Sequence, residues 1–226
     1  MKINLSGQSN KDSFIRNNQK EIAIGFCALL AVLVRIIFPA QMNGEIFWID
    51  IFLFFIFPWL VIRFLLKEKL NSFGISLGDK TKGIVLSAIF TAVFVLINYL
   101  IVRNPNLRGQ LQISPGIVKS FWIFLWFQLV ISLSAHFSSE FLFRGFIGLG
   151  MKNKLGGYAI VIQAIAQTIL YARSPWLIIL LIGSSSLFAG VISQKSRSII
   201  YPFVSMWLIS LSLDIMIIRY IHQGII

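Results

Sequence analysis

Long apolar runs alternate with short polar segments along most of the chain. Apolar runs lie at residues 22–40, 46–66, 83–102, 118–149, 158–172, 176–193 and 199–218. A helix needs about 20 apolar residues to cross a bilayer, and all of these runs except the shorter 158–172 approach or exceed that length. The pattern predicts an all-α, polytopic membrane helix bundle with about seven transmembrane helices.

The polar segments divide the chain into four parts. Residues 1–20 form a polar N-terminus, and residues 21–117 hold three of the predicted helices. Residues 118–219 hold the remaining four as a core, and residues 220–226 are a short tail. No internal repeat stands out, so we expect a single membrane domain.

Composition agrees with a membrane protein. The 226 residues are 57% hydrophobic and 12% charged, which excludes a soluble globular protein. The net charge of +12 raises nucleic acid as a partner, but most basic residues lie in short loops between apolar runs. Such a distribution is typical of membrane orientation, so we expect the lipid bilayer and no nucleic acid as partner.

The basic loops predict the orientation. One side of the predicted bundle collects Lys2, Lys11, Arg16, Lys20, Lys67, Lys69, Lys80, Lys82, Lys152, Lys154, Lys195 and Arg197. The other side has Arg103, Arg108, Lys119, Arg173 and Arg219. Because Lys and Arg accumulate in cytoplasmic loops, the N-terminus is expected in the cytoplasm and the C-terminus outside.

A stripe of polar residues interrupts the apolar run 118–149. Gln128, Ser132, His136, Glu140 and Arg144 recur every four residues and therefore share one face of a helix. Ionisable groups at membrane depth are costly and usually face the interior of a bundle, where they mark functional sites. Glu140 and Arg144 are spaced for an ion pair, with the acid in the favourable N-terminal position.

Residues 139–145, Ser-Glu-Phe-Leu-Phe-Arg-Gly, resemble a motif of the CPBP family, the CAAX-protease and bacteriocin-processing intramembrane metalloproteases. Members of that family typically carry Glu-Glu-x-x-x-Arg and Gly in one helix, Phe-x-x-x-His in the next, and His-x-x-x-Asn or Asp in a late helix. The resemblance extends over about residues 118–214. It implies a CAAX-protease-like core and a metal or an activated water held by Glu and His.

Most catalytic positions of that pattern carry other residues here. Ser139 stands where the first Glu belongs, while Glu140 and Arg144 are retained as catalytic-motif positions. The remaining degenerate motif positions are Gln167 for Phe, Tyr171 and Met206 for the two His, and Ser210 for Asn or Asp. Hydroxyl and thioether groups are poor zinc ligands and poor general bases. The resemblance therefore implies the fold, but neither a bound metal nor the activity.

Two other polar residues leave an alternative open. His136 lies one turn before Glu140, and Asp214 lies one turn beyond Ser210. The antiparallel helices could bring His136, Glu140 and Asp214 together as a relocated metal site. The structural interpretation, which we favour, is a buried His136–Asp214 hydrogen bond that orients two helices, beside a Glu140–Arg144 ion pair.

Three functions follow from these observations. The favoured one is a catalytically inactive scaffold or regulator that binds another membrane protein or a peptide, without a cofactor. The second is an active intramembrane metalloendopeptidase with altered ligands, for CAAX-type or bacteriocin-type peptides, which would need zinc. The third is a small transporter or channel component, suggested by polar groups at bilayer depth.

Overall fold

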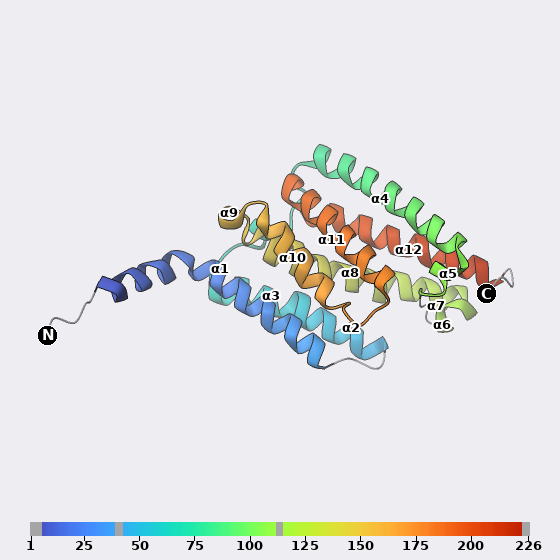
Figure 1. Ribbon diagram of the computed structural model, residues 1–226, viewed down its shortest axis with the longest axis horizontal. Helices are drawn as coiled ribbons and strands as arrows, with labels where there is room; N and C mark the ends of the chain where they lie inside the picture. The colour runs from blue at the N-terminus through green and yellow to red at the C-terminus, as the bar shows by residue number, and fades with distance from the viewer. Residues whose placement is uncertain (1–5, 39–42, 112–114, 223–226) are drawn as a thin grey trace.

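The computed structural model describes residues 6–38, 43–111 and 115–222, and every regular element in these ranges is a helix (Figure 1). The uninterrupted long helices are α1 (Ser6–Ile37), α4 (Lys80–Arg103), α10 (Tyr158–Ile169), α11 (Trp176–Ser196) and α12 (Ile200–His222). The short helices are η3 (Leu70–Phe73), α5 (Pro105–Arg108), α6 (Pro115–Lys119) and α9 (Lys152–Leu155). The all-α architecture predicted from hydropathy is confirmed.

Two further long helices contain stretches of π-helix. The first runs through α2 (Asn43–Ile51), η1 (Phe52–Ile56), α3 (Phe57–Leu60) and η2 (Val61–Leu66). The second runs through α7 (Phe121–Trp126), η4 (Phe127–Ser132), α8 (Leu133–Glu140) and η5 (Phe141–Leu149). Their i→i+5 hydrogen bonds change which side chains share a face, and π-helical turns are frequent at functional sites.

Five helices among the described residues are long and apolar enough to cross a membrane. They are Phe47–Leu66, Lys80–Arg103, Phe121–Leu149, Trp176–Ser196 and Ile200–His222. The other two predicted spans differ: α10 has 12 residues, and the apolar part of α1 follows Lys20 and Glu21 and contains Arg35. The chain is therefore an integral membrane protein, and the number seven stays a prediction.

Several element boundaries differ from those predicted. The polar segment 1–20 is already helical from Ser6. The predicted helix 118–149 is broken at Ser120, whose extended backbone (φ −151°, ψ 131°) separates α6 from α7. The helix α10 ends at Ile169, and turns occupy the rest of the predicted 158–172 span. At the C-terminus α12 continues to His222, past the start of the predicted tail, while residues 223–226 lie outside the described ranges.

The helices pack as two groups on either side of η5 and α10. In Figure 1, α1 lies beside the α2–α3 helix, and α4 lies beside α12 on the opposite side of the molecule. The larger apolar core joins α1, η1, η2 and η3 to η5 through Ile24, Phe54, Ile62, Phe73 and Phe143. A second cluster joins α4, α11 and α12.

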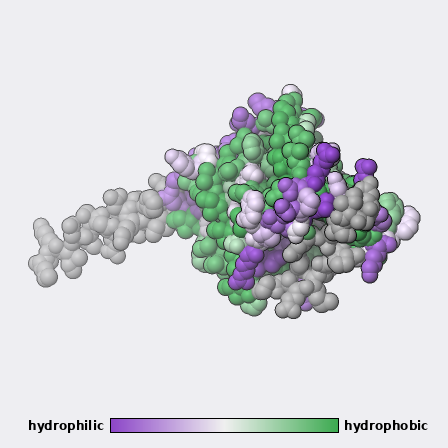
Figure 2. Space-filling view, turned by 45° about the vertical axis from the view of Figure 1, so that its right-hand side comes forward, coloured by the Kyte–Doolittle hydropathy of each residue, from purple (hydrophilic) through white to green (hydrophobic). Residues whose placement is uncertain are grey.

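Burial is concentrated in η5, where residues 141–148 are all buried. Gly145 allows this close packing, because a Cβ there would lie 2.7 Å from the backbone oxygen of Phe73. Large apolar side chains, by contrast, stay exposed over much of the outer surface, as the green areas of Figure 2 show. An outside as apolar as this fits a lipid environment.

The start of α4 is tied to the end of α11. Asp79 donates its backbone N–H to the Ser196 carbonyl (2.7 Å) and caps α4 by accepting from the Lys82 backbone N–H (3.1 Å). The Lys82 ammonium lies 2.8 Å from the same carboxylate. These hydrogen bonds with Lys82 hold the pKa of Asp79 below its usual range. The polar residues between the predicted second and third spans thus have a defined structural role.

Candidate functional site

The polar stripe predicted on one helix face lies in the interior of the bundle. Gln128, Ser132, Glu140 and Arg144 are buried, and His136 is half-buried. The helix that carries them, Phe121–Leu149, contacts α12 along α8, and contacts α10 and α11 along η5. Four of the five stripe residues are therefore shielded from lipid, as the four-residue spacing predicts.

Glu140 and Arg144 form the predicted ion pair. Arg144 Nε lies 3.1 Å from Glu140 Oε2, and the two side chains are 0% and 1% exposed. The two atoms are close, but neither satisfies hydrogen-bond geometry toward a partner in the described structure. The contact is thus mainly electrostatic, in surroundings where charge–charge attraction is strong.

Gln167 of α10 connects this pair to Ser139. Arg144 Nη1 donates to Gln167 Oε1 at 2.6 Å, and Gln167 Nε2 donates to Ser139 Oγ at 3.2 Å. Ser139 and Gln167 both occupy degenerate motif positions. In place of a second carboxylate beside Glu140, the chain therefore has a neutral hydrogen-bonded link between two helices. Sequence spacing offered no sign of this link, because the two residues are on different helices.

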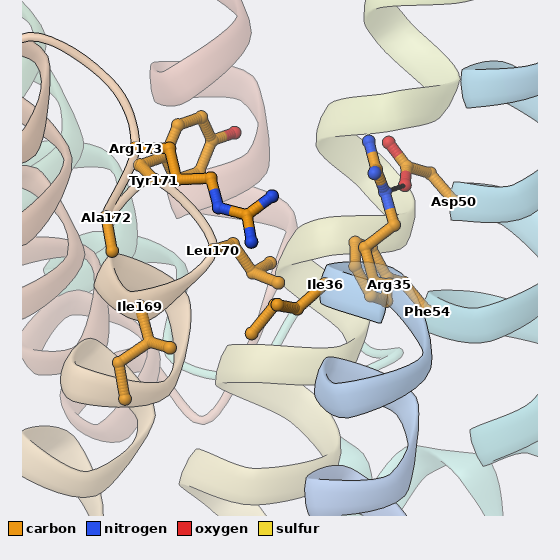
Figure 3. A pocket seen from close by; sticks show the side chains of 9 residues that line it. All are labelled: Arg35, Ile36, Asp50, Phe54, Ile169, Leu170, Tyr171, Ala172 and Arg173. Carbon is orange, nitrogen blue, oxygen red and sulfur yellow. Dashed lines mark hydrogen bonds and ion pairs between the residues drawn. The ribbon is translucent and has the colours of Figure 1, made fainter. Parts of the chain in front are cut away.

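The other degenerate motif positions lie elsewhere. Met206 is buried in the apolar cluster of α4, α11 and α12, with Phe90 and Phe94. Tyr171 is in the turn after α10 and lines a separate cavity (Figure 3). Ser210 is half-buried on α12. Of the five replaced positions, Ser139 and Gln167 join the Glu140–Arg144 pair directly.

The predicted His136–Asp214 hydrogen bond is wrong. Asp214 Oδ2 accepts from Gln128 Nε2 at 2.6 Å, and Trp207 Nε1 donates to the Gln128 carbonyl at 3.1 Å. The reason is the antiparallel register of the two helices. Phe137 packs against Phe203, with ring centroids 5.5 Å apart, so Asp214 lies further along α12, opposite Gln128.

The metal that the family pattern implies finds no suitable ligand set in the described part of the chain. No group of three or more His, Cys, Asp or Glu side chains comes together there. His136, Glu140 and Asp214 consequently do not form the relocated site considered above. Zinc sites use three or four such ligands, and the amide and hydroxyl of Gln167 and Ser139 do not replace them.

Comparison with protein families matches residues 120–212 to a model described as type II CAAX prenyl endopeptidase Rce1-like. Residues 120–212 of this chain are therefore similar to the CAAX-protease family. The matched segment contains the Glu140–Arg144 pair, Gln167 and Met206, and it covers most of the predicted core. Searches of curated proteins and of solved structures found no match.

We predict that the Glu140–Arg144 ion pair stabilises the fold, and that this stabilisation requires both charges together. Arg144→Met leaves the buried Glu140 carboxylate without its partner, which costs about 3–5 kcal/mol of stability. The double variant Glu140→Gln/Arg144→Met removes both charges and should recover most of that loss. Thermal unfolding of the purified protein in detergent measures both effects.

The matched control is Lys82→Met, which breaks an exposed ion pair with Asp79. Exposed ion pairs contribute little to stability, so this variant should unfold close to the original temperature. If Arg144→Met unfolds like the Lys82→Met control, Glu140 and Arg144 are not a structural pair.

Proposed function

We propose that this CAAX-protease-like chain binds a membrane protein or peptide without hydrolysing it, as a scaffold or regulator. The observation that supports this proposal is the buried ion pair of Glu140 with Arg144. The Glu140 carboxylate is buried against Arg144, and the adjoining positions provide the neutral groups of Ser139 and Gln167.

Peptide hydrolysis needs an activated water and a general base beside it. In the matched family segment Glu140 is the retained acid of the motif, and its charge is already opposed by a guanidinium. Neither Tyr171 nor Met206 offers an imidazole in place of the missing histidines. The histidines that would hold a metal to lower the pKa of that water are thus replaced, and the retained Glu140 is engaged with Arg144.

A groove beside the polar stripe supports a binding role. Its volume is about 350 Å³, and its lining is Ile51, Phe55, Leu133, Ser134, Phe137, Ser138 and Phe203. Apolar and aromatic walls with two hydroxyl groups suit a transmembrane helix or an apolar peptide segment. Ser138 directly precedes Ser139, so an occupant of the groove would lie next to the former catalytic helix face.

The binding proposal predicts contact without cleavage. A photoreactive amino acid at Ser134 should yield a discrete cross-linked adduct in membranes, whereas the same group at exposed Ile84 of α4 should not. A farnesylated CAAX peptide incubated with purified protein and zinc should remain intact. Zinc-dependent cleavage that Glu140→Gln abolishes would refute the proposal, as would equal adducts at both positions.

We also propose a cytoplasmic N-terminus, from the distribution of basic loops. In a Cys27→Ser background, single cysteines at Asn106 and Lys69 lie at exposed positions on opposite predicted sides. A membrane-impermeant maleimide should label Asn106→Cys in intact cells, and Lys69→Cys only after permeabilisation. The reverse labelling pattern would invert the topology.

A further inference from the structure

A second cavity lies away from the polar stripe, between the end of α1, the beginning of the α2–α3 helix and the turn after α10. Its volume is about 300 Å³. The residues that line it are Arg35, Ile36, Asp50, Phe54, Ile169, Leu170, Tyr171, Ala172 and Arg173 (Figure 3). They come from three segments far apart in the sequence. The proposed binding groove shares none of them, and of the motif positions only Tyr171 reaches this cavity.

The charged groups of this cavity leave one positive charge unopposed. Arg35 Nε lies 2.7 Å from Asp50 Oδ1, and this pair is largely shielded, with side-chain exposures of 22% and 15%. Arg173 is exposed and forms no ion pair with any residue in the described ranges. In Figure 3 its guanidinium extends between Tyr171 and the Arg35–Asp50 pair. The cavity therefore carries a net charge of about +1 and suits a singly charged anion.

The remaining walls are apolar, and the surroundings indicate the level of the lipid headgroups. Ile36, Phe54, Ile169 and Leu170 line the cavity beside the charged groups. Trp48, two residues before Asp50, is 69% exposed, and Trp176, three residues after Arg173, is 57% exposed. Exposed tryptophans of membrane proteins concentrate at the boundary between headgroups and acyl chains.

We propose that this cavity binds the phosphate of an anionic phospholipid. The planar guanidinium of Arg173 offers two parallel N–H donors to phosphate oxygens, and the Tyr171 hydroxyl offers a third donor. The apolar walls then contact the first part of the acyl chains. A free phosphate ion would use the polar groups alone, whereas a phospholipid uses the polar and the apolar walls together.

The test measures lipid retention by the full-length protein in detergent, using native mass spectrometry with phosphatidylglycerol and with phosphatidylcholine. The original protein should retain phosphatidylglycerol in preference to phosphatidylcholine. Arg173→Gln should weaken phosphatidylglycerol retention about tenfold, because a charge-assisted hydrogen-bond donor to the phosphate is lost. Arg173→Lys keeps the charge but loses the paired donors. Its phosphatidylglycerol retention should therefore lie between that of the original protein and that of Arg173→Gln.

The matched control is Arg103→Gln, which removes another exposed arginine from the same predicted side of the membrane. It should retain phosphatidylglycerol like the original protein. Tyr171→Phe, which removes only a hydroxyl, should show a smaller loss and serves as the second variant if Arg173→Gln does not fold.

Two results would overturn the proposal. Equal losses in Arg173→Gln and Arg103→Gln would indicate nonspecific attraction of anionic lipid to a basic protein. Displacement of phosphatidylglycerol by inorganic phosphate at equal concentration would assign the cavity to the free ion instead of the lipid. Retention that survives inorganic phosphate and depends on Arg173 supports the lipid assignment.

Discussion

The buried ion pair of Glu140 and Arg144 is the interaction on which the rest of the structure depends. Charges cost several kcal/mol to remove from water, so a pair with 0% and 1% exposure persists only while both partners stay in place. The bundle meets this condition by burying all of residues 141–148 and by placing Gln167 against Arg144. The packing of these helices and the pairing of the two buried charges therefore depend on each other.

The ion pair with Arg144 also limits the chemistry that Glu140 can perform. A carboxylate that counterbalances a guanidinium, without the two histidines of the family pattern beside it, is poorly suited to activate water. The same network holds Ser139 in a hydrogen bond to α10, where an acidic residue would have added a second buried charge. The helix contacts and the apolar groove beside α8 are the features on which the proposed binding role rests.

Much of the fold was predictable because the bilayer requires long apolar helices, and the i,i+4 spacing of Glu140 and Arg144 was enough to predict their ion pair. The Asp214–Gln128 hydrogen bond was not predictable, since it depends on the register of two helices and on the π-helical stretch η4. The cavity lined by Arg35 and Arg173 could not be predicted from the sequence for a similar reason. Its residues lie on separate segments and share no motif, and the only signal was charged residues near span ends.

The state of Glu140 can be observed directly by X-ray diffraction from crystals of the protein soaked in zinc, with data collected at the zinc absorption edge. We expect the Glu140 carboxylate to stay against Arg144, with no anomalous peak within bonding distance of it. An anomalous peak coordinated by Glu140, with the carboxylate turned away from Arg144, would contradict a structural role for this residue and assign it a catalytic one.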